Sequence, residues 1–121
     1  MKIRISAGKV ALEAELRDTP TTRALAEALP FEASASMWGD EVYFTTPVSA
    51  ELEADAKQVV EPGTVCFWTQ GDALALPFGR TPISTDERPK LANPCNVLGV
   101  IRDFSGLKSI NAGQKVRVEK L

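Results

Sequence analysis

The stretch EPGTVCFWTQGDALALPF, residues 61–78, alternates turns with strands. Residues 61–63 predict a turn, because proline presets φ and glycine supplies a positive φ. The continuous apolar run at 65–68 predicts a strand. Residues 70–72 predict the next turn, after which residues 73–78 run back with alternate apolar side chains on one face. The stretch therefore predicts two antiparallel strands.

Short strands of the same kind are predicted on both sides of this stretch. Residues 2–17 alternate apolar with charged side chains around Gly8, which is typical of a hairpin of half-buried strands. Residues 79–95 contain three prolines and predict a long loop, and a loop of this length is more often functional than accidental. Further strands are predicted over residues 31–36, 41–45 and 96–101 and around Val116 and Val118.

One helix stands out among these strands. Thr19 is a good N-cap, and Pro20 suits the first helical position. The following stretch TTRALAEAL, residues 21–29, carries its alanines and leucines along one stripe, and Pro30 helps to end it. A short amphipathic helix is expected here, covering one open end of the sheet. A second helical turn is expected around residues 107–110.

Length and composition exclude several classes of protein. The 121 residues predict a single domain over 1–121, with 44% apolar and 25% charged residues as in ordinary globular proteins. The net charge is −2 and no basic stripe is present, so nucleic acid is not expected as a partner. No stretch is long and apolar enough for a membrane span, and the N-terminus does not resemble a signal peptide. A cytoplasmic protein with no membrane partner is expected.

The sequence also limits the chemistry. The chain has no histidine, so it cannot form a Ser-His-Asp or Cys-His triad, and it lacks the commonest zinc ligand. Its two cysteines, Cys66 and Cys95, form no C-x-x-C pair. The aspartates do not have the spacing of a metal loop, and no glycine-rich phosphate loop is present. We expect no metal and no cofactor.

Many short strands separated by Gly and Pro turns are typical of a β-barrel or a sandwich. Four segments then narrow this choice, because their order resembles that of a family of small prokaryotic cyclophilin-like proteins. The resemblance implies a closed cyclophilin-type β-barrel of about eight strands with one or two short helices at its ends. The family's function is not established. The segments are MWGDEVYF (37–44), EPGTVCFW (61–68), ALALPFGRTPIS (73–84) and NVLG (96–99).

The chain departs from true cyclophilins at the strand that would be active. In cyclophilins that strand carries a Phe-His-Arg-Val-type run whose arginine holds the prolyl substrate. The matching strand here is Glu41-Val42-Tyr43-Phe44, which has a carboxylate and no arginine. A carboxylate has the wrong sign for a group that must stabilise charge at the prolyl nitrogen.

Aromatic residues gather in the segments that carry the resemblance. They could line an apolar pocket for a proline ring or another small hydrophobic group. Phe44, Phe67 and Phe78 alternate along strands, which favours packing in the core. Trp38 precedes a glycine in a turn, where a bulky side chain can line a cleft as well as fill the core.

Polar residues complete the candidate site. Glu41 and Tyr43 share a strand face, which favours an ordinary solvated face over a ligand clamp. The segment after Phe78 offers the Arg80 guanidinium and the hydroxyls of nearby residues, either as a binding loop or as a structural turn. The candidate ligand-binding residues are Trp38, Glu41, Tyr43, Trp68, Phe78, Arg80, Thr81 and Ser84.

Three functions are compatible with these residues, and two of them are enzymatic. The first is a binding domain that takes a peptide or small molecule in an aromatic-lined groove. The second is a peptidyl-prolyl isomerase in which Arg80 replaces the missing arginine, with Arg102 as the other candidate. The third is a small-molecule enzyme that uses Glu41 as general base, which requires a dry site and a raised pKa. The absence of an arginine from the matching strand favours the first.

Overall fold

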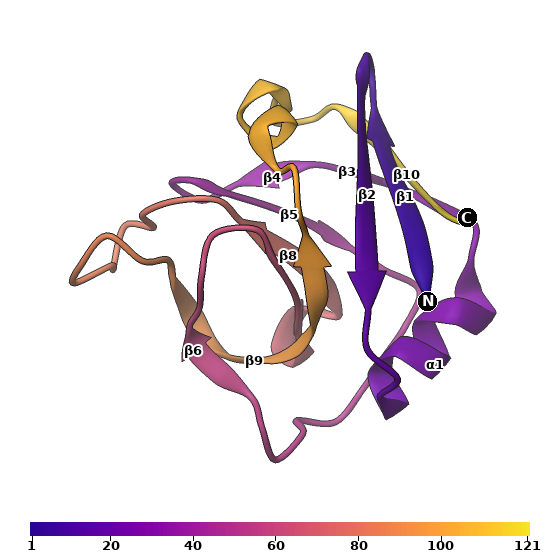
Figure 1. The fold of residues 1–121 in the computed structure, drawn as a ribbon, viewed down its shortest axis with the longest axis horizontal. Coiled ribbons are helices and arrows are strands. Elements are labelled where there is room, and N and C mark those ends of the chain that lie inside the picture. Colours follow the sequence, from indigo (N-terminus) through magenta and orange to yellow (C-terminus); the bar gives the residue numbers. More distant parts are fainter.

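The computed structural model describes residues 1–121 and consists mostly of antiparallel strands that curl around a common core (Figure 1). The predicted mainly β fold with short helices is confirmed. The strands are β1 (Lys2–Ala7), β2 (Val10–Leu16), β3 (Phe31–Ser34), β4 (Ser36–Met37), β5 (Glu41–Thr45), β6 (Lys57–Val59), β7 (Thr64–Trp68), β8 (Ala73–Pro77), β9 (Lys90–Ile101) and β10 (Lys115–Lys120), and the helices are α1 (Pro20–Ala28) and the 3-10 helices η1 (Thr69–Gly71) and η2 (Ser105–Ser109).

The strands form one ten-stranded sheet rather than the eight or so strands expected. Its hydrogen-bonded order is β3-β10-β1-β2-β9-β7-β8-β5-β4, and β6 pairs with β9 outside this path. The two ends of the path, β3 and β4, are consecutive in the chain and are separated by Ala35. No ladder joins them, so hydrogen bonds alone do not close the sheet.

The main core lies on the inner face of this curled sheet. The N-terminal hairpin contributes alternate side chains such as Ile3, Ile5 and Leu12, while Phe44 and Phe67 come from the other half of the sheet. Helix α1 begins as predicted: Thr19 and Thr22 form a capping box, and Pro20 occupies the first turn. Its Leu25 is completely buried in the same core. None of the helices is long and apolar enough to cross a membrane.

A second, smaller core lies on the outer face of β7 and β8. It comprises Val60, Cys66, Ala75, Leu91 and Cys95. All five residues of β8, and all of β7 except Trp68, are buried, so these strands are covered on both faces. A strand covered on both faces has no polar side to present, which explains the continuous apolar run in the sequence.

The cover over this outer face is the first half of β9, and here the predicted loop at 79–95 is wrong. The structure ends the loop at Pro89, and residues 90–95 belong to β9. Asn93 and Pro94 interrupt the apolar pattern, so periodicity did not indicate a strand here. These residues are paired with β6 across a register shift, with Lys57 opposite Cys95 and Val59 opposite Lys90. Pairing with a distant strand therefore decides this segment.

Asn96 ties three parts of the chain to the sheet. Its side chain is completely buried and donates to Thr21 Oγ1 (3.0 Å) and to the carbonyl oxygen of Glu51 (2.9 Å). Its Oδ1 accepts from the backbone N–H of Glu53 at 2.7 Å. One amide thus fastens the start of α1 and the connection before β6 to β9.

We expect Asn96→Ala to lower the free energy of unfolding by about 2 kcal/mol, because it leaves buried donors and acceptors unpaired. Residues 46–56 should also become more sensitive to proteases, since they lose two anchors. Urea denaturation and limited proteolysis measure both effects. Asn111→Ala, at an exposed turn, is the control, and equal behaviour of the two variants would contradict the prediction.

Candidate binding pocket

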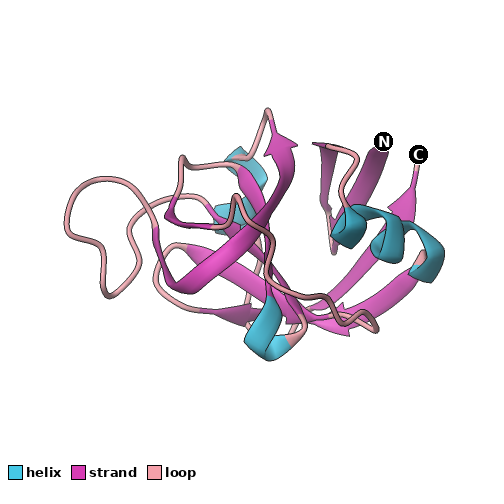
Figure 2. Ribbon diagram, turned by 90° about the horizontal axis from the view of Figure 1, so that it is seen from below, coloured by secondary structure: helices cyan, strands magenta, loops and turns pink.

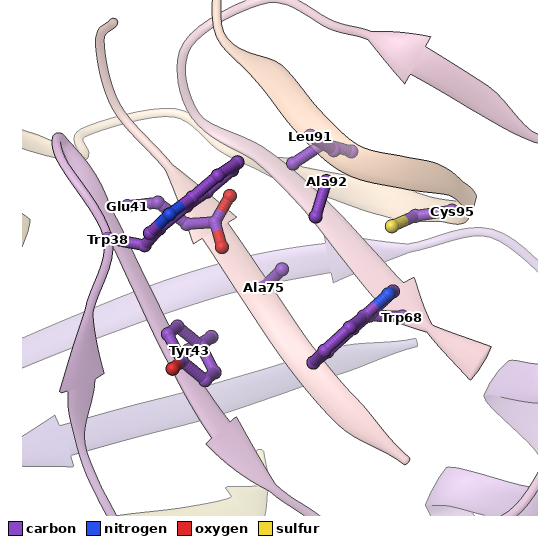
Figure 3. Close-up of a pocket in the computed structure, with 8 residues that line it drawn as sticks. All are labelled: Trp38, Glu41, Tyr43, Trp68, Ala75, Leu91, Ala92 and Cys95. Carbon is purple, nitrogen blue, oxygen red and sulfur yellow. The ribbon is translucent and has the colours of Figure 1, made fainter. Parts of the chain in front are cut away.

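A pocket of about 200 Å³ opens on the outer face of the sheet, next to the smaller core (Figure 3). The turn before β5 brings one side chain, and β5, β7, β8 and the start of β9 bring the others. The loop between β8 and β9 projects away from the body of the molecule, on the side opposite α1 (Figures 1 and 2). The lining residues are Trp38, Glu41, Tyr43, Trp68, Ala75, Leu91, Ala92 and Cys95.

Glu41 is the one charged residue in this lining. Glu41 is 6% exposed, and its Oε1 is buried with no hydrogen-bond partner. Burial destabilises the charged form and raises the pKa of Glu41 to about 7. Glu41 and Tyr43 do share a face, as expected, but the favoured solvated face is wrong, because Glu41 is buried and both residues line the pocket.

Aromatic rings form the walls of the pocket. The rings of Tyr43 and Trp68 meet edge to face, with centroids 6.4 Å apart and an interplanar angle of 86°. The indole Nε1 of Trp68 donates to Asn93 Oδ1 at 3.0 Å, which fixes the orientation of that ring. Figure 3 shows the indoles of Trp38 and Trp68 on opposite sides of Ala75, with their faces turned toward each other.

The two thiols near Glu41 are chemically quiet. Both cysteines are free and buried. Burial raises the pKa of Cys66 and raises that of Cys95 to about 12, and negative charge on Glu41 acts in the same direction on both. They stay protonated at neutral pH and are not activated nucleophiles. No group of three or more Cys, Asp or Glu side chains is placed to hold a metal ion.

The other candidate residues lie outside the pocket. Arg80 is half exposed on the loop, with Nη1 3.4 Å from Glu87 Oε1 and Nη2 3.4 Å from the carbonyl oxygen of Ser84. Phe78 packs against the main core. Arg102 lines a separate polar groove beside Glu13, Glu15 and Asp103.

Thr81 and Ser84 hold the base of the loop instead of facing the pocket. The Thr81 hydroxyl donates to the carbonyl oxygen of Lys90, 2.5 Å away. Ser84 Oγ accepts from the backbone N–H groups of Thr81 (2.9 Å) and Lys90 (3.1 Å). These bonds support a structural role for both hydroxyls.

The pocket also contains residues that the sequence analysis missed. Leu91, Ala92, Cys95 and the supporting Asn93 all lie in the segment expected to be loop. The usable signal was indirect: β7 and β8 are apolar on both faces, so some other segment had to cover their outer face.

Fold and pocket together define a small, mainly β domain with an apolar, aromatic-walled pocket and one buried carboxyl on the outside of its sheet. The sequence model of the family described as cyclophilin-like matches residues 1–119, and the chain belongs to this family. The chain is also similar to a hypothetical protein from Archaeoglobus fulgidus, known from its solution structure. The two share 44% sequence identity with a TM-score of 0.87, and the alignment covers 100% of this chain and 95% of the other. No curated protein matches the chain.

Proposed function

We propose that the protein binds a small molecule or one side chain of a peptide in the pocket formed by Trp38, Glu41, Tyr43 and Trp68. One observation carries the proposal: Glu41 Oε1 is a buried acceptor without a partner in an otherwise apolar cavity. Leaving such an atom unpaired costs roughly 1–3 kcal/mol. A bound ligand that supplies a hydrogen-bond donor would remove this cost.

The size of the pocket limits the ligand. Pockets for drug-sized ligands usually measure roughly 300–1,000 Å³, and this one measures about 200 Å³. It suits a compact group of a few heavy atoms, with one polar end near Glu41 and apolar surface toward the indoles.

Prolyl isomerisation is less well supported. It requires a positive group near the prolyl nitrogen, and no lysine or arginine lines the pocket. The Arg80 guanidinium is engaged by Glu87 on the projecting loop, and Arg102 lies in a different groove.

A second candidate function follows from Glu41 itself. A carboxyl group whose pKa is about 7 can accept a proton efficiently at neutral pH, as a general base does. If the pocket removes a proton from carbon, a bound ligand should exchange that hydrogen with deuterated solvent, and Glu41→Gln should stop the exchange. Proton NMR of the ligand in deuterated buffer measures this directly.

We also infer that the sheet acts mechanically as a closed barrel. Residues 31–37 pair with β10 through their first part and with β5 through their last part. One continuous segment therefore bridges the two ends of the hydrogen-bonded path. The backbone amides of β3 and β4 should then exchange with solvent in a single cooperative event, which hydrogen-exchange NMR measures.

Tryptophan fluorescence tests the binding proposal, because the chain has only two tryptophans and both line the pocket. In a screen of small fragments by ligand-observed NMR, we expect binders to change this emission. Ala92→Phe should abolish the change, since Ala92 is an exposed lining residue at the mouth of the pocket. Ala112→Phe, at an exposed turn, should leave it intact. Fragments that leave the emission unchanged, or that bind Ala92→Phe equally well, would contradict the proposal.

A further inference from the structure

We propose that the pocket is an aromatic cage for an alkylammonium cation, with Trp38, Tyr43 and Trp68 as the walls and the Glu41 carboxylate as the counter-charge. This inference rests on the binding function proposed above and names its ligand class. Aromatic rings attract cations through the negative potential of their faces, and indole does so most strongly.

The arrangement of the walls fits a compact cation. The two indoles face each other across Ala75, so a group between them contacts two π faces at once (Figure 3). Tyr43 closes a third side through its edge-to-face contact with Trp68. The hydrogen bond from Trp68 to Asn93 holds its indole in place before any ligand arrives. This wall of the cage is therefore preformed, which lowers the entropic cost of binding.

The charges around the pocket also favour a cation. Glu41 is the only lining residue that can carry charge near neutral pH, and no lysine or arginine lines the pocket to neutralise it. The titratable groups near Glu41 are the Cys66 and Cys95 thiols, which stay neutral, and the Tyr43 hydroxyl, whereas Asp40 and Lys90 do not line the pocket. A positive ligand would supply the partner that the chain lacks.

The apolar walls of the pocket favour an alkylated nitrogen over a primary ammonium. A primary ammonium carries three N–H donors and needs an acceptor for each. The side-chain oxygens of the lining belong to Glu41 and Tyr43 alone, and the rest of the lining is apolar. A tertiary or quaternary ammonium has one donor or none, and its methyl groups match the apolar walls.

The pH dependence of affinity distinguishes a cation from a neutral ligand that accepts a hydrogen bond. A cation favours ionised Glu41, so its affinity should rise about tenfold between pH 6 and pH 8 as the carboxyl group loses its proton near pH 7. A neutral ligand that accepts a hydrogen bond needs protonated Glu41, and its affinity should fall over the same range. A rise in affinity therefore excludes a neutral acceptor, and an uncharged probe of the same shape is needed to separate a cation from a neutral donor.

The test compares choline with 3,3-dimethyl-1-butanol, its uncharged analogue of the same shape. Calorimetry and tryptophan fluorescence at pH 6 and pH 8 measure both affinities. At pH 8 we expect choline to bind about tenfold tighter than the alcohol. Glu41→Gln should remove this preference, while Glu27→Gln, an exposed change on α1, should keep it.

A second variant keeps the test decisive if Glu41→Gln folds poorly. Trp68→Leu removes one aromatic face and leaves Trp38 as the fluorescent reporter. This variant should lower the affinity for choline more than it lowers the affinity for the alcohol. Equal losses of affinity for the two probes would contradict the proposed aromatic cage.

The remaining outcomes separate this inference from the binding proposal. If the alcohol binds as tightly as choline, and Ala92→Phe blocks both, the cation is wrong and the pocket still binds ligands. If neither probe binds, the cage is wrong, and the fragment screen decides the binding proposal by itself.

The same cation could be a free metabolite or a methylated lysine side chain. A short peptide with trimethyllysine and its unmethylated counterpart distinguish these sources. Tighter binding of the methylated peptide than of choline assigns the cation to a protein partner, and the reverse assigns it to a small molecule. Binding of both peptides with equal affinity would overturn the cage.

Discussion

The free energy of unfolding is expected to fall by about 3 kcal/mol as the pH rises from about 4 to 8, because of Glu41 alone. Burial raises its pKa in the folded protein from 4.5 to about 7. Between these two values the folded state holds a proton that the unfolded state has released, so raising the pH favours unfolding. Each pKa unit corresponds to about 1.4 kcal/mol.

Urea denaturation of the natural protein and of Glu41→Gln at pH 5, 6, 7 and 8 measures this effect. Glutamine has nearly the same shape and no charge, so the difference between the two proteins isolates the titration of Glu41. Asp86, whose pKa the hydrogen bond from Arg88 lowers to about 2, titrates in both proteins and cancels. Parallel pH profiles for the two proteins would show that Glu41 is not desolvated.

The loss of folding stability caused by ionised Glu41 indicates that this residue has a function. A neutral side chain at position 41 would make the fold more stable above pH 7, since nothing in the chain partners the buried oxygen. Destabilising groups of this kind concentrate at functional sites, where a ligand supplies the missing interaction. A bound cation should therefore reduce this slope, and the natural protein saturated with choline should lose less stability between pH 6 and pH 8.

Local rules predicted the parts of the fold that neighbouring residues decide. The hairpin at 2–17 follows from period-two alternation, and β1 and β2 pair in register from Lys2 opposite Glu15 to Ala7 opposite Val10. The start of α1 follows from Thr19 and Pro20, which act through contacts within one turn. Such features need no knowledge of distant segments.

Long-range pairing decided what the sequence could not show. Residues 90–95 contain a proline and polar side chains, yet they form a strand because β6 pairs with them. This strand supplies Leu91, Ala92 and Cys95 to the pocket that Glu41 lines. Part of the protein around Glu41 thus comes from a segment distant in the sequence, and no pattern around position 41 records it.

Long-range pairing also decides which of the candidate residues lie in the pocket. Trp38, Glu41, Tyr43 and Trp68 meet in the pocket because β5 and β7 both pair with β8. Arg80 is only a few residues from β8, but the loop that carries it has its own hydrogen bonds and ion pair and turns outward. Closeness in sequence to a site strand did not place its side chain in the site.

Gly99→Ala should lower the free energy of unfolding by more than about 3 kcal/mol, the upper end of ordinary overpacking. A Cβ at this position would strike the carbonyl oxygen of Glu15 and lie 2.8 Å from Leu16 Cα. Both obstacles belong to the backbone of β2, so no side-chain rotation can relieve them. Strands β2 and β9 would have to separate.

Separating β2 from β9 should lower the stability of the fold strongly, because the ladder between these strands joins the two parts of the sheet. On one side lie β3, β10, β1 and β2, and on the other lie β9 and the strands that build the pocket. The ladder between them has three paired positions, one of which is Leu16 opposite Gly99.

Val100→Ala is the matched control for this prediction. Val100 is the next residue of β9 and also pairs with β2, opposite Glu15, but its side chain is 48% exposed. Val100→Ala should lower the free energy of unfolding by less than about 1 kcal/mol, as exposed strand substitutions do. Urea denaturation followed by tryptophan emission compares the two variants, and similar midpoints would mean that β2 and β9 do not approach as closely as described. A clear loss in Gly99→Ala alone would show that the pocket strands depend on a contact between backbones, at a site with no side chain of its own.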